Sequence, residues 1–200
     1  MAIKPILFNT EMIRAILDGR KSCTRRILKH DVEAILNSPY HKEHPEVEDE
    51  QIISKLCMPP YQPGDILYVR ETWCALPVNE AGHMRGHSTY YYRADGDLRP
   101  SGWRGKWNPS IHMPKEAARI WLKVTDVRVE RLQEITADGI RNEGLSSAAV
   151  HCGDMEIALK EWENLWNSTI KKSDLDRYGW DASPWVWVIE FERCEKPETQ

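Results

Sequence analysis

The residues of this sequence best suited to chemistry lie in one short segment, from Gly19 to Arg26. Lys21 and Thr24 stand three positions apart within it. A threonine hydroxyl is a weak nucleophile until a base takes its proton, and a lysine can be that base only as the neutral amine. In a regular strand the two side chains would point to opposite faces, but they can share a face if Lys21 still belongs to the preceding turn. The pair therefore indicates covalent catalysis by an activated threonine.

Three arginines surround this pair, namely Arg20, Arg25 and Arg26. A further positive charge beside them is unfavourable, so they favour the neutral amine of Lys21. The cluster also has a purely structural interpretation. Cations at a helix C-terminus complement its dipole, and a charged edge strand resists pairing with other chains. On composition alone the structural interpretation is favoured.

Two glutamates are candidates for a carboxylate beside the lysine. Glu71 follows a predicted strand, and Glu143 ends a predicted short helix just before Gly144. Such a carboxylate could orient the Lys21 ammonium and bond the reacting group, although its charge would oppose the neutral amine. Either glutamate could equally form a salt bridge to one of the arginines. Residue spacing leaves both possibilities open.

Some of the nine tryptophans lie outside predicted core positions. Four of them lie at strand ends or in loops beside cations such as Arg93: Trp73, Trp103, Trp107 and Trp180. Loop aromatics beside cations can stack on nucleic-acid bases, but a loop folded back onto its own tryptophan explains them equally well. Glu71, Trp73 and Arg93 are therefore candidate substrate contacts, together with the three arginines.

The composition narrows the class of protein. The net charge of −4 argues against a broad basic face held on nucleic-acid phosphates, so any nucleic-acid contact should be local. Five scattered cysteines and seven histidines show no regular metal-ligand spacing, so we expect reduced thiols and no metal or other cofactor. The first residues resemble neither a leader nor a membrane span, which predicts a cytoplasmic protein. No sequence feature indicates an oligomeric state.

Strands and helices are expected to alternate irregularly along a single domain over residues 1–195, followed by a polar tail at 196–200. Thr10 is the expected N-cap of the first helix and Gly19 its stop, and the segment after Ser22 is expected to form an edge or pocket-lining strand. Residues 29–60 look like an insertion with weak helical stretches at 32–36 and 50–56, and residues 76–88 and 96–114 form irregular stretches longer than ordinary connections. The other expected strands lie at 5–8, 66–71, 89–93, 119–131 and 184–193, and the other helices at 136–143 and after Asp154.

Two motifs resemble a known family. Residues 18–26, DGRKSCTRR, are similar to the Gly-Arg-Lys-Thr-x-Thr-x-Arg signature of ASCH-domain proteins, with Ser22 where the signature prefers threonine. Residues 63–69, PGDILYV, resemble the family's second marker, and the whole chain is similar to a longer branch often encoded in prophages. The resemblance implies an α+β fold: a PUA-like mixed β-barrel with flanking helices, two long loop insertions at about 29–60 and 76–115, and a cleft between barrel and helices.

The resemblance also implies a function. Some small members of the family are amidohydrolases that remove the acyl group from 4-acetylcytidine with a lysine, a threonine and a glutamate. By motif position these roles fall on Lys21, Thr24 and Glu143. The substrate would be an N-acylated cytidine, as a nucleoside or within single-stranded RNA. The alternative is a non-catalytic module that holds a base in the same cleft while the arginines contact phosphates.

Overall fold

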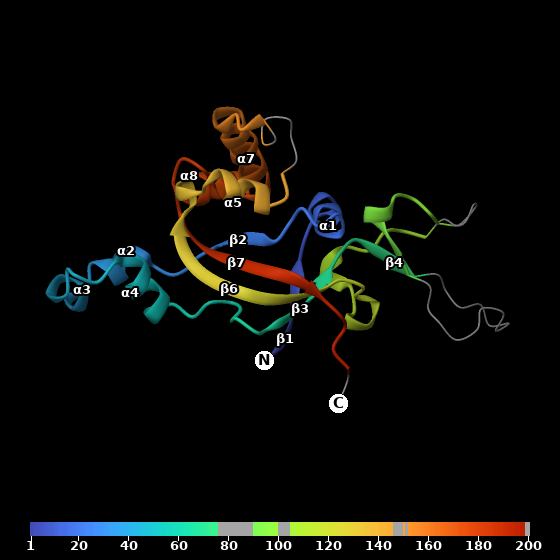
Figure 1. Ribbon diagram of the computed structural model, residues 1–200, viewed down its shortest axis with the longest axis horizontal. Coiled ribbons are helices and arrows are strands. Elements are labelled where there is room, and N and C mark those ends of the chain that lie inside the picture. Colours follow the sequence, from blue (N-terminus) through green and yellow to red (C-terminus); the bar gives the residue numbers. More distant parts are fainter. Residues whose placement is uncertain (76–89, 100–104, 146–149, 151, 199–200) are drawn as a thin grey trace. The chain divides into compact units, whose positions relative to one another are not determined.

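The computed structural model describes residues 1–75, 90–99, 105–145, 150 and 152–198 (Figure 1). The fold is α+β, with a mixed five-stranded sheet of order β1-β3-β6-β7-β2 and a two-stranded sheet of β4 and β5. The chain divides into two compact units: Met1–Gly19, Asp65–Lys123 and Arg193–Gln200 form the first, and Arg20–Gly64 and Val124–Glu192 the second. The α+β class agrees with the sequence, whereas closure into a barrel and a single domain over 1–195 stay predictions.

The first unit contains the parallel pair of strands. β1 (Ile3–Leu7) pairs with β3 (Ile66–Arg70), and β3 pairs antiparallel with the first residues of β6 (Trp121–Arg131). Asp65 fixes the start of this pairing, because its carboxylate accepts from Lys4 Nζ and from the backbone of Ala2, each at 2.8 Å. β1 is the outer strand of this pair and buries only Ile6, whereas β3 buries Ile66, Leu67 and Val69.

α1 (Thr10–Leu17) follows β1 and buries one face of apolar residues. The predicted N-cap, Thr10, is wrong: Asn9 is the cap, and its side chain accepts from the Met12 N–H at 2.8 Å. Asn9 has extended backbone, which turns its side chain back onto the first turn, whereas Thr10 is already helical. The predicted stop is correct, since Gly19 has φ 74°, a conformation that favours glycine.

The rest of the first unit consists of short elements: β4 (Trp73–Ala75), β5 (Tyr90–Tyr92), η1 (Arg93–Asp95), η2 (Ser110–His112) and η3 (Lys115–Ala117). A core cluster of Ile66, Met113, Ala117, Ala118 and Trp121 holds them together. The predicted strand at 89–93 is therefore present in part, as β5. Residues 76–89 and 100–104 of the insertion predicted at 76–115, including Trp103, lie outside the described residues.

The second unit contains the other antiparallel pair. β2 (Cys23–Ile27) pairs with β7 (Trp185–Cys194) and stands last in the strand order, as expected of an edge strand. Thr24 lies opposite Ile189, and Arg25 opposite Val188. Residues directly opposite each other in an antiparallel pair share a face, and successive residues alternate between faces. Arg25 and Val188 therefore lie on one face of the ribbon, and Thr24 and Ile189 on the other.

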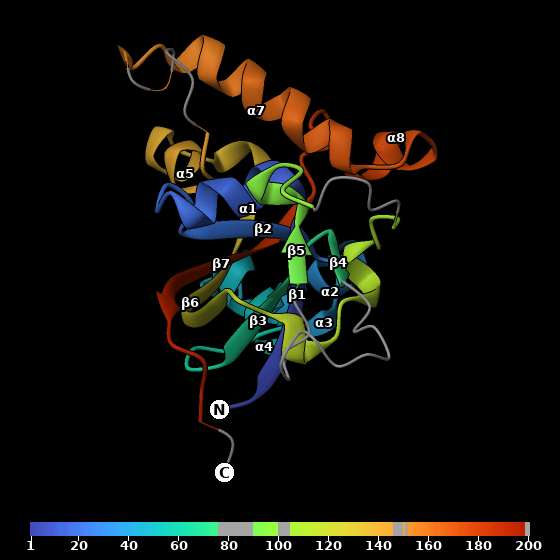
Figure 2. The ribbon, with the colours of Figure 1, turned by 90° about the vertical axis from the view of Figure 1, so that its right-hand side faces the viewer.

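Two groups of helices belong to the second unit. α5 (Ala137–Asn142), α7 (Met155–Thr169) and α8 (Leu175–Tyr178) follow β6, with η4 (Leu132–Glu134) and η5 (Lys172–Asp174) between them. Trp162 and Trp166 of α7 and Ile140 of α5 pack with Val186 and Val188 of β7 in one core cluster. These helices therefore cover one face of the β2–β7 ribbon (Figures 1 and 2).

The first predicted insertion forms a small helical group, α2 (Val32–Leu36), α3 (Pro39–Glu43) and α4 (Asp49–Leu56). The helical stretches expected at 32–36 and 50–56 are α2 and α4. Only α3 is unexpected, and it begins with Ser38 as a side-chain cap and Pro39 in the first turn. Within the described residues, no helix combines the length and the apolar content needed to cross a lipid bilayer.

Candidate functional site

Lys21 and Glu143 lie side by side although 122 residues separate them. Glu143 caps the C-terminus of α5, and Lys21 forms an isolated antiparallel bridge with it just before β2. The Ser22 backbone N–H reinforces this bridge by donating to the Asn142 carbonyl at 2.9 Å. Lys21 Nζ donates to Glu143 Oε2 at 2.5 Å and to the Glu143 carbonyl at 3.0 Å. The edge of β2 and the end of α5 therefore position the two side chains together.

Arg25 completes this buried ionic cluster. Its Nη1 donates to the other carboxylate oxygen of Glu143, Oε1, at 3.1 Å. Its Nε and Nη2 donate to Glu130 Oε1 at 2.8 and 2.5 Å. The side chains of Lys21, Arg25 and Glu143 are 1%, 2% and 3% exposed, and that of Glu130 is 17% exposed. Two cations and two carboxylates thus balance in charge, which is what burial of ionised groups requires.

The burial and the charges of this cluster shift the pKa values of Arg25 and Cys23. Burial acts to lower the pKa of the Arg25 guanidinium, but Glu143 and Glu130 outweigh it, so the net pKa is raised. Burial, and then the charge of Glu143, raise the pKa of the Cys23 thiol to about 12. Cys23 Sγ lies 3.8 Å from Arg25 Nη1. Cys23 is therefore a neutral thiol at physiological pH and not a nucleophile.

Gly139 of α5 makes room for the arginine. A Cβ at this position would lie 2.9 Å from Ile135 Cγ1 and 3.0 Å from Arg25 Nη2. On its other side Arg25 lies over the Trp162 ring, with Cζ 5.9 Å from the ring centroid. The guanidinium is thus confined between α5 and α7, and its position fixes the Glu143 carboxylate.

Thr24 does not enter this cluster. It is buried, with 4% of its surface exposed, and shares its face of the ribbon with Ile189. Lys21, Cys23 and Arg25 lie on the α5 side, as their contacts with Glu143 and Gly139 show. The structure therefore brings Lys21, Arg25 and Glu143 together and places Thr24 on the opposite face of β2. Their catalytic roles stay predictions.

No family model matches this chain, and neither does any curated protein. Among solved structures, the hypothetical protein PH0355 shares 14% identity over 97% of this chain and 100% of its own, with a TM-score of 0.41. An ASCH domain from Lactobacillus crispatus JV V101 shares 11% identity over 96% of this chain and 79% of its own, with a TM-score of 0.40. At these scores neither likeness decides the chemistry of this chain.

The two other arginines of the segment make separate contacts. Arg20 Nη1 donates to the Gly144 carbonyl at 2.5 Å, just beyond the C-terminus of α5. Arg26 lies on the Thr24 face of β2, where burial lowers its pKa while Glu143 and Tyr61 act to raise it. A cation at a helix C-terminus has a structural role of its own, because it complements the helix dipole. Binding of phosphates by Arg20, Arg25 and Arg26 stays a prediction.

Glu71 lies in the first unit and has a different set of partners. Arg119 Nε and Nη2 donate to its two carboxylate oxygens at 2.9 and 3.0 Å. The same guanidinium donates to both Asp95 oxygens and lies over the Tyr92 ring, 4.0 Å from its centroid. Burial raises the pKa of Glu71 and outweighs the charge of Arg119, which acts to lower it. Sequence reasoning missed Arg119, whose only signal is its position directly before the apolar run of β6.

Trp73 and Arg93 belong to compact loop packing in the first unit. Trp73 exchanges backbone hydrogen bonds with Asn108, and its ring meets that of Tyr90 edge to face. Arg93 lies over the Trp107 ring at 5.5 Å from its centroid, and Arg99 lies over the same ring at 4.7 Å. These contacts match the interpretation in which a loop packs on its own tryptophan. Stacking of a base at this position stays a prediction.

The described residues do not assemble a metal site. No three of their histidine, cysteine, aspartate and glutamate side chains gather closely enough to hold an ion. All five cysteines have free thiols, and three of them, Cys23, Cys57 and Cys74, are buried.

Proposed function

We propose that this chain is an ASCH-type, PUA-like amidohydrolase that removes the acyl group from N-acylated cytidine, as in 4-acetylcytidine. The observation that carries the proposal is the contact between Lys21 Nζ and Glu143 Oε2. Lys21 lies in the motif at residues 18–26, and Glu143 ends the short helix α5 far along the chain. An amine and a carboxylate fixed together can move a proton between a nucleophile and a leaving nitrogen.

The reaction needs a nucleophilic oxygen at the acyl carbonyl carbon. In the proposed reaction Glu143 takes a proton from the Lys21 ammonium, the Thr24 hydroxyl attacks, its proton passes to the now neutral Lys21 amine, and the bond between carbonyl carbon and exocyclic nitrogen breaks. The leaving nitrogen takes the proton from Lys21, and cytidine departs. Water then hydrolyses the threonine ester to the free carboxylic acid. Glu143 orients the Lys21 amine throughout.

The position of Thr24 allows a second scheme, in which water and not threonine attacks the acyl group. Because Thr24 lies on the face of β2 opposite Arg25, a water molecule held by Lys21 and Glu143 is a competing nucleophile. The products are identical in the two schemes. The scheme with water needs no ester intermediate and no threonine.

The proposal is tested by incubating the purified chain with 4-acetylcytidine and measuring the cytidine released. Lys21→Met and Glu143→Gln are expected to lower kcat/KM by about 100-fold or more, the usual contribution of a positioned acid or base. Thr24→Ala should do the same if threonine attacks, whereas retained turnover assigns the attack to water. Glu163→Gln, at an exposed pair on α7, is the matched control.

Folding must be separated from chemistry, because all three residues are buried. Circular dichroism of each variant checks the fold, and Lys21→Met/Glu143→Leu removes both charges while keeping the volume filled. Absence of cytidine release by the wild-type chain contradicts the proposal. Binding of 4-acetylcytidine or single-stranded RNA without turnover favours the alternative of a base-binding module.

A further inference from the structure

The buried ionic cluster of the candidate site continues along the sheet of the second unit to the surface. Glu130 of β6 accepts from Arg25 Nε and Nη2 through Oε1, at 2.8 and 2.5 Å. Its other oxygen, Oε2, lies 3.7 Å from Arg128 Nε, and Arg128 Nη1 donates to Glu190 Oε1 at 2.5 Å. The side chains of Arg128 and Glu190 are 44% and 40% exposed. Cations and carboxylates therefore alternate from the buried site to the exposed face of β6 and β7.

The donors of the Arg25 guanidinium are divided between two carboxylates. Nε and Nη2 form the side-on pair of donors that fits a carboxylate, and a single oxygen of Glu130 takes both. Nη1 donates to Glu143 Oε1 at 3.1 Å. The second oxygen of Glu143, Oε2, accepts from Lys21 Nζ at 2.5 Å. Glu130 therefore occupies the edge of Arg25 that would otherwise compete with Lys21 for Glu143.

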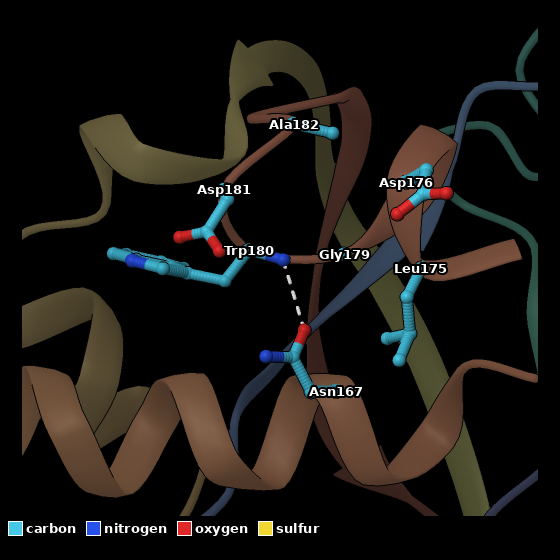
Figure 3. A pocket seen from close by; sticks show the side chains of 7 residues that line it. All are labelled: Asn167, Leu175, Asp176, Gly179, Trp180, Asp181 and Ala182. Atoms are coloured by element: carbon cyan, nitrogen blue, oxygen red, sulfur yellow. Dashed lines mark hydrogen bonds between the residues drawn. The ribbon is translucent and has the colours of Figure 1, made fainter. Parts of the chain in front are cut away.

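The packing behind Arg25 keeps its guanidinium within reach of both carboxylates. Its Cζ lies 5.9 Å from the centroid of the Trp162 ring, which belongs to a buried core cluster. Trp166 of the same cluster donates from Nε1 to the Tyr178 carbonyl at 2.8 Å. Trp180 packs against this cluster from the loop that borders a hollow of about 360 Å³ (Figure 3). Loss of Glu130 would therefore change the hydrogen bonds of Arg25 more than its place.

The loss of Glu130 has a definite chemical consequence at the candidate site. Arginine and carboxylate prefer two parallel hydrogen bonds, so a guanidinium without Glu130 would turn its free side-on edge toward Glu143. Bidentate pairing with Arg25 would draw Oε2 of Glu143 away from Lys21. In the proposed reaction Glu143 takes the proton of the Lys21 ammonium. The competing pair would therefore slow the chemical step.

We propose that Glu130 is a positioning residue of the candidate site, which holds the side-on edge of Arg25 and so keeps the Glu143 carboxylate available to Lys21. Glu130 acts through Arg25 and touches no reacting atom. The effect on catalysis rests on the proposed hydrolase function, whereas the effect on the contact between Lys21 and Glu143 rests on the geometry alone. The two effects can therefore be measured separately.

Glu130→Met tests the contact, because methionine fills a similar volume and offers Arg25 neither a charge nor an oxygen. NMR of the full chain with isotope-labelled lysine follows the ammonium hydrogens of Lys21, and the Lys21→Met protein identifies their signal. Their exchange with water should quicken about tenfold or more in Glu130→Met, since the hydrogen bond to Glu143 Oε2 is lost. Glu130→Gln keeps an oxygen for Arg25, so exchange should stay within about threefold of the wild type.

Turnover of 4-acetylcytidine tests the catalytic consequence. Glu130→Met should lower kcat about tenfold or more. It should also move the pH of half-maximal kcat downward by about 0.5 unit or more, because removing a negative charge favours loss of a proton nearby. A purely structural role would lower the folded fraction without moving this pH. Asp126→Asn is the matched control, since Asp126 lies on the same strand and pairs with Arg128 at 3.1 Å, and it should change neither measurement.

Unchanged ammonium exchange in a folded Glu130→Met protein overturns the proposal, and so does equally quickened exchange in Asp126→Asn. If the methionine variant does not fold, the pH shift is measured on Glu130→Gln, which loses the charge alone, and its absence there overturns the proposal. Quickened exchange in Glu130→Met with no cytidine release by the wild type supports the role of Glu130 and overturns the proposed hydrolase function instead.

Discussion

Oε2 of Glu143 lies 2.5 Å from Nζ of Lys21, and Oε1 of the same carboxylate lies 3.1 Å from Nη1 of Arg25. All three side chains are almost wholly buried. A buried charge that loses its partner keeps its full desolvation cost, so each member of the trio depends on the others. The second unit is therefore sensitive to the loss of any one of them.

Lys21→Met should lower the free energy of unfolding by about 3 kcal/mol, because it leaves the buried Glu143 with one cation instead of two. Lys21→Met/Glu143→Leu should recover most of that loss, since it removes both charges and keeps the space filled. Urea unfolding followed by circular dichroism measures both. Lys160→Met, at an exposed pair with Glu163, is the control and should cost under about 0.5 kcal/mol. A double variant less stable than the single one contradicts this account.

Gly139→Ala should destabilise the protein by about 1 to 2 kcal/mol, although alanine normally favours a helix over glycine. The new Cβ would lie 2.9 Å from Ile135 Cγ1 and 3.0 Å from Arg25 Nη2, and both side chains are buried. Thermal unfolding measures the change. Asn142→Ala, at an exposed position in the same helix, adds no such contact and should be neutral or slightly stabilising. A Gly139→Ala protein as stable as the wild type means that Arg25 has room to move.

Stability should fall as the pH rises above about 9, in part because of Cys23. Its pKa is raised from 9.0 to about 12 in the folded protein, so the folded state holds the thiol proton more tightly than the unfolded chain does. The stabilisation is complete below pH 9 and is lost between about pH 9 and 12, with a slope of about 1.4 kcal/mol per pH unit. Urea unfolding of wild type and Cys23→Ala at pH 8.5 and 10 measures it. Equal slopes in the two proteins refute the assignment.

Arg119→Gln should cost about 3 kcal/mol of stability, because it leaves Glu71 buried without its cation. Asp95→Asn should cost less, since Asp95 is a third exposed and water can replace its partner. Chemical unfolding of the two variants gives the comparison. If Glu71 is purely structural, the Arg119→Gln protein that remains folded hydrolyses 4-acetylcytidine at the wild-type rate. A selective loss of activity would instead support Glu71 as a substrate contact.

The sequence predicted the elements whose signals are local. Asp154 caps α7 and Gly19 ends α1, because capping depends on residues within a turn of one another. Thr10 was the wrong cap because two adjacent residues could both cap, and only the backbone conformation distinguishes them. α3 was missed because a five-residue helix that begins with proline has no apolar stripe.

The sequence by itself determined the identity of the chemical groups and the alternation of β2, which separates Thr24 from Arg25. Only the tertiary structure decided which carboxylate lies beside which cation. Spacing could not choose between Glu71 and Glu143, because a contact across 122 residues depends on strand register and on where α5 ends. Glu71 faces Arg119 for the same kind of reason. Local pattern thus fixes what each residue can do, while long-range pairing fixes its partner.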